Sequence, residues 1–322
     1  MARSVLGAFA ILALAAGGSA AGERSGRIAF VRYVGPHQEL FTVAPDGTGL
    51  RRLTRNRVED YDPKWSPEGR RLMSFGSTGI VVRDLKGTVL RRLPRTCCQV
   101  GDWSPDGRLI AHLEFACDDP SGKGGPACAN LWIVRSGGSG RRRLVKEGLD
   151  ATGGFDRLYA WAPGARRLVY TASTKALVIV DVATGGKRTL RGTRFGEHPA
   201  WSPDGRRIAF LRQKAPFGGS DIYVVAPDGS GLRPLVRSRS HLEAPTWSPD
   251  GRHLAYFRLV AGTPGDERYA VMVAVTSTTE WLDWSPDSTG VLWTSFNRIF
   301  VARADGSTPA RLVATGDAPD WG

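Results

Sequence analysis

The sequence is poor in lysine and cysteine, and it has no long hydrophobic run after its first 22 residues. Only seven of its 44 basic residues are Lys, so Arg provides most of the formal net charge of +13. Four Cys in 322 residues are too few for a scaffold built from disulfides. Gly and Pro number 40 and 20, below the level typical of disordered chains. This composition excludes a disulfide-rich miniprotein, a bundle of membrane spans and a disordered chain, and it favours a globular protein with a large core.

Short catalytic motifs are also missing. The sequence contains no G-x-S-x-G, no G-x-x-x-x-G-K-[ST] and no G-x-G-x-x-G, which mark a nucleophile elbow, a phosphate-binding loop and a dinucleotide site. The stretch from Ser285 to Trp293 is similar to the Asp box of sialidases but carries one residue too many. We therefore assign no catalytic residue and no cofactor from the sequence.

The first 22 residues form a targeting segment. Arg3 precedes an apolar run from Val5 to Ala16, and small residues follow up to Gly22. This order predicts a secretory signal peptide over residues 1–22 that is cleaved between Ala20 and Gly22; an uncleaved anchor helix is the alternative. The sequence thus predicts an extracytoplasmic protein, periplasmic or secreted, without a transmembrane span after cleavage. Residues 23–322 then form one domain.

One phrase recurs along that domain, and it begins with Trp. The Trp residues are spaced by 37 to 58 residues, on average about 43, which is the length of a four-stranded propeller blade. The six phrases are Trp65-Ser-Pro-Glu-Gly69, Trp103-Ser-Pro-Asp-Gly107, Trp161-Ala-Pro-Gly-Ala165, Trp201-Ser-Pro-Asp-Gly205, Trp247-Ser-Pro-Asp-Gly251 and Trp284-Ser-Pro-Asp-Ser288, and a seventh begins at Ala318.

Each repeat predicts four antiparallel strands, A to D. Strand A ends at the Trp, and the Ser-Pro-Asp-Gly turn leads into an apolar strand B, as in residues 207–212. The N-terminal part supplies strands B, C and D at residues 27–33, 39–43 and 50–54, and residues 317–321 supply an A strand. Together they predict an all-β propeller of seven four-stranded blades, closed by the C-terminal strand. Six blades is the alternative, because no clear D strand follows Val275.

The phrases at 198–210 and 244–257, with the Ile-Tyr-Val-x-x-x-Asp-Gly stretch at 221–229, resemble the repeat of TolB-type β-propellers. The resemblance covers nearly all of residues 27–322 and concerns the repeat and the fold. TolB itself carries an N-terminal α/β domain, and similar propellers cap serine peptidases. The repeats leave no room here for either additional domain, so the resemblance implies a propeller alone. By analogy with TolB, the resemblance also implies a role of this propeller in an envelope complex.

The two faces of the predicted propeller differ in the length of their loops. The A–B and C–D turns are repetitive, whereas the B–C loops and the connections to the next blade vary, and variable loops on a rigid scaffold are where binding usually occurs. Phe217 is predicted to be exposed on one such loop. Cys97 and Cys98 precede the second complete repeat, and Cys117 and Cys128 fall in its long B–C loop. We expect two disulfides between these pairs, with other pairings and a zinc site as alternatives.

The residues four positions before each Trp are predicted to lie at the channel mouth on the variable face. They are Tyr61, Gln99, Arg157, Glu197, Glu243, Glu280 and Asp317. Four consecutive blades thus supply a carboxylate, and this arc is the predicted site for a basic partner residue or a divalent cation. His198 and His241 lie nearby and make a transition-metal site a further alternative. Solvated strand starts would also explain the pattern.

The positive charge has a structural interpretation. Eleven basic residues fall in predicted D strands, the outer edges of the blades, where charge prevents edge-to-edge pairing; they are Arg51, Arg52, Arg91, Arg92, Arg141, Arg142, Arg143, Lys187, Arg188, Arg233 and Arg311. We expect no nucleic-acid partner. A polyanionic polymer or an anionic lipid surface remains an alternative. The sequence predicts a monomeric, non-enzymatic scaffold for a protein or cell-envelope component. The rival is a lyase or lactonase with a metal at the channel mouth.

Overall fold

The computed structural model describes residues 26–55, 58–76, 79–93, 98–115, 128–150, 157–214, 219–259, 269–271, 282–295 and 297–322. All regular elements in these ranges are β-strands, as the sequence predicts. Within them no helix is long and apolar enough to cross a membrane. The signal peptide predicted over residues 1–22 lies outside the described residues.

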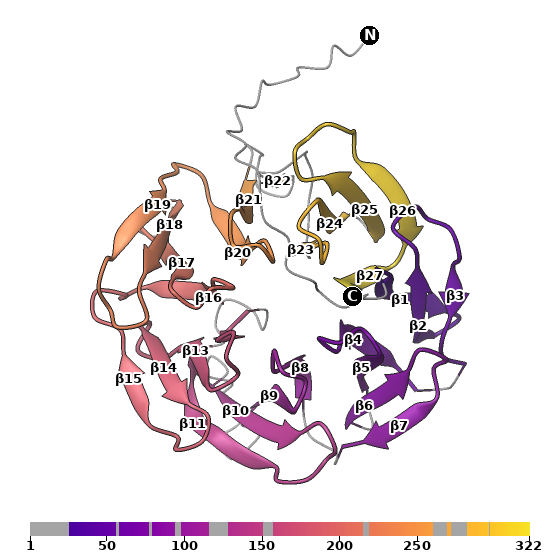
Figure 1. The fold of residues 1–322 in the computed structure, drawn as a ribbon, viewed down its shortest axis with the longest axis horizontal. Coiled ribbons are helices and arrows are strands. Elements are labelled where there is room, and N and C mark those ends of the chain that lie inside the picture. The colour runs from indigo at the N-terminus through magenta and orange to yellow at the C-terminus, as the bar shows by residue number, and fades with distance from the viewer. Residues whose placement is uncertain are drawn as a thin grey trace.

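The strands form antiparallel sheets arranged in a ring around a central axis, with the first strand of each sheet innermost (Figure 1). The sheet that holds both ends of the described chain contains β27 (Asp317–Trp321), β1 (Ile28–Val34), β2 (His37–Val43) and β3 (Arg51–Arg52). The next contains β4 (Asp60–Trp65), β5 (Arg71–Gly76), β6 (Gly79–Asp84) and β7 (Val89–Arg92). It is followed by β8 (Cys98–Trp103), β9 (Leu109–Phe115), β10 (Cys128–Arg135) and β11 (Arg142–Asp150).

The other half of the ring repeats this meander. One sheet contains β12 (Tyr159–Trp161), β13 (Arg167–Thr171), β14 (Leu177–Asp181) and β15 (Lys187–Thr189), and the next contains β16 (Gly196–Trp201), β17 (Ile208–Gln213), β18 (Ser220–Val225) and β19 (Arg233–Val236). Then come β20 (Leu242–Trp247), β21 (Leu254–Leu259) and β22 (Tyr269–Val271). The ring ends with β23 (Leu282–Trp284), β24 (Gly290–Ser295), β25 (Arg298–Arg303) and β26 (Arg311–Thr315).

The prediction of seven four-stranded blades is wrong. In the described residues six sheets have four strands, whereas the sheet β20-β21-β22 has three. This sheet is the segment in which the sequence has no clear D strand after Val275. The other repeats place a basic, apolar-alternating D strand after their second turn, and this repeat has no such stretch. Among the residues that the structure describes, the complete four-stranded blades therefore number six.

The C-terminal strand closes the ring by pairing with the N-terminal part of the chain. Ile28 pairs with Trp321 and Val31 with Asp317, so one blade is built from both ends of the described chain. Gly316, just before β27, has φ of +155°, and a Cβ there would lie 2.3 Å from the Phe30 ring. Only glycine allows this close approach of β27 to β1.

The Ser-Pro-Asp-Gly turns are closed by a repeated set of hydrogen bonds. In the turn between β16 and β17, Ser202 Oγ donates to Asp204 Oδ1 at 2.5 Å, and the Arg206 amide donates to the same oxygen at 3.0 Å. The Arg207 amide donates to Ser202 Oγ at 2.9 Å. Gly205 has φ of +70°, the left-handed conformation that glycine adopts without strain. The repeated phrase therefore specifies the turn, as predicted.

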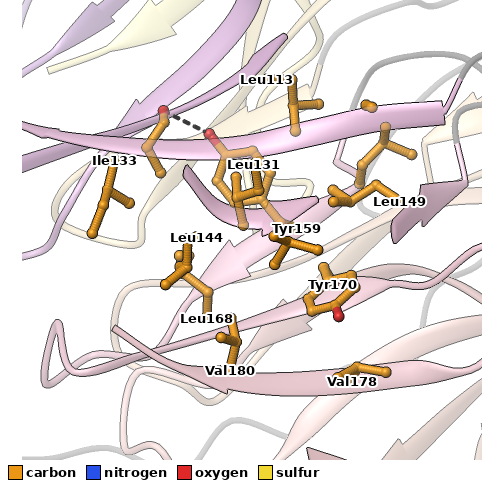
Figure 2. Packing of buried hydrophobic residues seen from close by; sticks show 14 of the residues in the cluster. Leu113, Leu131, Ile133, Leu144, Leu149, Tyr159, Leu168, Tyr170, Val178 and Val180 are labelled. Atoms are coloured by element: carbon orange, nitrogen blue, oxygen red, sulfur yellow. Dashed lines mark hydrogen bonds between the residues drawn. The ribbon is translucent and has the colours of Figure 1, made fainter. Parts of the chain in front are cut away.

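The core lies between neighbouring blades. Figure 2 shows one such layer, in which Leu131 and Leu144 of one blade pack against Leu168 and Val180 of the next, while the Tyr159 hydroxyl donates to the Ala111 carbonyl at 2.9 Å. Blade-to-blade packing of this kind buries both faces of a sheet, which explains the continuous apolar pattern of its middle strands.

Several Trp residues of the repeated phrase also join neighbouring blades. The Trp247 indole N–H donates to the Ala200 carbonyl of the preceding blade at 3.2 Å, and Trp103 and Trp284 make the equivalent bonds to the preceding blades. The Arg207 guanidinium lies 4.5 Å from the Trp247 ring centroid, a cation–π contact between blades.

Candidate binding site in the axial cavity

Several inner strands share an irregularity just before the Trp. In β4 the register shifts between Tyr61, which pairs with Phe75, and Lys64, which pairs with Met73, so that one extra residue is inserted. The same shift occurs in β16 and β20. A residue with positive φ followed by Pro forms each bulge, at 62–63, 198–199 and 244–245. The insertion changes the alternation of side chains along the strand.

These strands enclose a cavity of about 530 Å³, here called the axial cavity, which is lined by residues from the innermost strand of every sheet. Its charged lining residues are Asp62, Lys64, Asp102, Arg157, Glu243, Asp283 and Asp320. Five carboxylates thus face two basic groups. In a chain whose formal charge is +13, this excess of acid is local to the cavity.

Lys64 is at the centre of the acidic group. Its Nζ lies 3.3 Å from Asp62 Oδ1 and 3.8 Å from Asp320 Oδ1, and Asp62 belongs to the same strand while Asp320 belongs to β27. Burial disfavours the ammonium form, but these two carboxylates and two further aspartates outweigh burial, so the pKa of Lys64 is raised above its ordinary value. Lys64 therefore stays charged and neutralises part of the cavity.

The aspartates immediately before three of the Trp residues have perturbed acidities. Burial raises the pKa of Asp102 to about 6, against the effect of Lys64. Burial, together with Asp283 and Asp102, raises the pKa of Asp320 to about 7, and burial also raises the pKa of Asp283. A cation that entered the cavity would favour the ionised form of all three groups.

Backbone amides hold two of these carboxylates in place. Asp320 Oδ2 accepts from the Trp65 amide at 2.7 Å, and Asp283 Oδ2 accepts from the Trp321 amide at 3.0 Å. In both pairs the donor belongs to the next blade. The acids therefore link successive blades across the ring closure as well as lining the cavity.

Arg157 and His198 complete the polar lining. Arg157 reaches from the segment before β12 to β20 and β23, where its guanidinium donates to Thr246 Oγ1 and, at 2.6 Å, to the Leu282 carbonyl. Burial, with Arg157 and His241 nearby, lowers the pKa of His198 to about 4. Its Nδ1 is buried and has no hydrogen-bond partner among the described residues.

The structure separates the members of the predicted carboxylate arc. Glu243 lines the axial cavity, with its Oε1 at 3.5 Å from His241 Nε2. Glu197 lies outside the lining residues. Its Oε1 lies 3.6 Å from Lys175 Nζ, and its Oε2 accepts from the side-chain amide of Gln213 at 3.0 Å. Asp317 Oδ1 accepts from the Ala318 amide.

Other predicted residues are placed differently or are not described. Tyr61 packs against the core cluster of β5 and β6. Glu280, Phe217, Cys97 and Cys117 lie outside the described residues, as does the side chain of Gln99. Of the other two cysteines only the backbone is described: Cys98 begins β8 and Cys128 begins β10. The described residues contain no group of three or more His, Cys, Asp or Glu side chains arranged to hold a metal ion.

Sequence reasoning missed Asp102, Asp283 and Asp320, although a pattern marks them. Each stands directly before a Trp, and the pair Asp-Trp occurs at three of the seven phrases. The prediction used the position four before the Trp, which a regular strand would place at the channel mouth. In the described structure the cavity is lined mainly by positions one and three before the Trp, such as Lys64 and Asp62, and of the position-four residues only Arg157 and Glu243 line it.

Several basic residues of the outer strands have partners in the neighbouring blade. Arg142 of β11 donates to the Val182 carbonyl, Arg188 of β15 to the Pro227 carbonyl, and Arg311 of β26 to the Pro45 carbonyl at 2.6 Å. Each acceptor lies in the turn after the third strand of the next blade. Part of the positive charge therefore joins blades around the rim.

A ring of radially arranged antiparallel sheets around an axial cavity defines a β-propeller. Similar proteins carry the TolB name, which confirms the resemblance drawn from the repeats. The chain is 25% identical over 212 residues to a TolB homolog of Chlorobium luteolum, a match that covers 63% of this chain and 45% of the relative. The chain thus spans about half the length of that relative.

Solved structures show the same fold. TolB from Acinetobacter baumannii superposes with a TM-score of 0.55 at 17% identity, covering 93% of this chain and 67% of that one. An oligogalacturonate lyase from Vibrio parahaemolyticus has a TM-score of 0.60 at 15% identity, covering 89% and 86%. At these identities the likeness concerns the fold. No protein-family model matches the sequence.

Proposed function

We propose that this protein is an extracytoplasmic scaffold that binds a basic segment of a protein, or of another cell-envelope component, in its axial cavity. The observation that carries the proposal is the excess of carboxylates in a cavity of about 530 Å³ within a strongly basic chain. A Lys or Arg side chain of the partner would relieve the repulsion among these buried acids. The similarity to proteins named TolB and the signal peptide predicted over residues 1–22 support a site of action outside the cytoplasm.

A peptide titration tests this proposal. A short peptide rich in Lys and Arg is titrated into the mature protein by calorimetry, and a matched peptide with Glu in place of the basic residues serves as the reference. We expect the basic peptide alone to bind, with an affinity that falls as salt is raised. Equal binding of both peptides, or of neither, would contradict the proposal.

Two Glu-to-Gln variants locate the peptide. Glu243→Gln removes a cavity carboxylate that is one-third exposed, and we expect binding to weaken by about twofold to fivefold, the effect of one partly exposed charge pair. Glu68→Gln is the matched control, because its side chain is similarly exposed at 37% but pairs with Arg71 in a turn outside the axial cavity. Equal loss in both variants would place the peptide elsewhere.

The enzymatic alternative makes a different prediction for anionic sugars. The similarity to an oligogalacturonate lyase is one of fold, and a polyuronate would meet the carboxylates Asp62, Asp102 and Glu243 in the cavity. We therefore expect no binding and no cleavage of oligogalacturonate, with or without added divalent cations. Appearance of unsaturated products, measured by ultraviolet absorbance, would favour the lyase.

A further inference from the structure

A second, smaller cavity lies at the end of the channel formed by the Ser-Pro turns. This turn-side pocket has a volume of about 210 Å³ and is lined by Trp65, Trp247, Trp284 and Trp321, together with three prolines of the turns. The four Trp residues come from four consecutive blades of the ring, whose inner strands are β4, β20, β23 and β27. The pocket therefore has an aromatic component from every one of these blades.

Two carboxylates also line the pocket, and both are fixed. Asp283 and Asp320 each accept a hydrogen bond from the backbone amide of a pocket tryptophan, at 3.0 Å and 2.7 Å. Lys64 approaches Asp320 at 3.8 Å but is not one of the lining residues. The described lining contains no Lys, Arg or His, so its only ionisable side chains are these two acids.

We propose that the turn-side pocket binds an organic ammonium group, with a quaternary ammonium preferred. Indole rings attract cations through their π-faces, and this attraction is stronger where water is excluded. A bound cation would favour the ionised form of the two acids, and the described lining holds no competing basic side chain. The volume is sufficient, because a cavity of about 150 Å³ accepts benzene, and a trimethylammonium head is of similar size. This proposal does not depend on the proposed function of the axial cavity.

Choline and its uncharged isostere 3,3-dimethylbutan-1-ol test the proposal on the unmodified mature protein. The two molecules have nearly the same shape, so a difference between them reports the charge. We expect choline to change the tryptophan fluorescence in a saturable manner and to bind about tenfold or more tightly than the alcohol, as a desolvated cation–π contact implies. Equal affinities, or no saturable change with choline, would overturn the proposal.

Two variants assign the site. Asp283→Asn removes a carboxylate that lines both cavities, and we expect the choline affinity to fall by about tenfold. Glu243→Gln is the control, because Glu243 lines the axial cavity and not the turn-side pocket. If Glu243→Gln weakens choline binding as much as Asp283→Asn, choline occupies the axial cavity and the proposal is wrong. Circular dichroism verifies that both variants are folded, and the comparison of choline with the alcohol remains decisive if Asp283→Asn is not.

Discussion

Removal of residues 317–322 tests whether β27 holds the ring together. The deletion removes the pairs that join Ile28 to Trp321 and Val31 to Asp317, and the hydrogen bond from the Gly322 amide to the Arg27 carbonyl at 3.0 Å. It also removes Asp320, which accepts from the Trp65 amide. The inner strand of one blade is then missing, and the edge of β1 is open.

The magnitude follows from these contacts. The lost hydrogen bonds contribute about 1 kcal/mol each to the net stability. The half-buried Trp321 side chain contributes about 2 to 3 kcal/mol, less than a fully buried Trp. The free energy of unfolding should therefore fall by about 5 kcal/mol, which is a large part of the total stability of a typical domain. For a chain of this size that loss lowers Tm by about 10 °C or more.

Scanning calorimetry of the mature and truncated proteins measures the effect. Trp321→Ala should give a smaller decrease in Tm, and Tyr33→Ala is the control, because Tyr33 is an aromatic residue on β1 that is 62% exposed. A synthetic peptide of residues 316–322 added to the truncated protein should restore part of the lost Tm by rebuilding the sheet. A truncated protein that melts within about 2 °C of the intact one would refute the role of β27 in closure.

Three further predictions concern acidity, blade contacts and thiols. Because the pKa of Asp320 is raised to about 7 in the folded protein, the folded state binds the carboxyl proton more tightly than the unfolded state does. The protonated Asp320 therefore contributes most to stability at acid pH, and this contribution is lost as the pH rises towards 7. Asp320→Asn should therefore reduce the fall of stability with pH, by at most about 1.4 kcal/mol per pH unit, and identical slopes in urea unfolding of variant and wild type would contradict this. Arg207→Ala should lower stability by about 1 kcal/mol through its contact with Trp247, whereas the exposed neighbour Arg206→Ala should not; equal Tm values for the two variants would show that the contact contributes nothing. Mass spectrometry of the exported, non-reduced protein should find all four cysteines oxidised in two disulfides, and free thiols would exclude them.

The sequence could predict most of the fold because its turns are specified locally. The Ser-Pro-Asp-Gly phrase forms its own hydrogen bonds within a few residues, as at Ser202 and Asp204, and the alternating apolar strands follow at a constant distance. The closing strand was predicted at residues 317–321, which are the bounds of β27. The number of four-stranded blades was not predicted correctly, because the sheet that begins with β20 has three strands in the described residues.

The sequence by itself therefore determined the repeat, the meander of each sheet and the pairing of the two ends, since each depends on contacts within one repeat or on an unpaired strand at each end. Only the tertiary structure decided which residues line the cavity. Asp102 and Asp320 line the cavity and Glu197 does not, although Glu243 at the equivalent position of the next blade does. The charge state of Lys64 likewise depends on Asp320, a residue more than 250 positions away in the chain that lies in contact with it through ring closure. Distances of this kind are set by the packing of whole blades, and no local pattern records them.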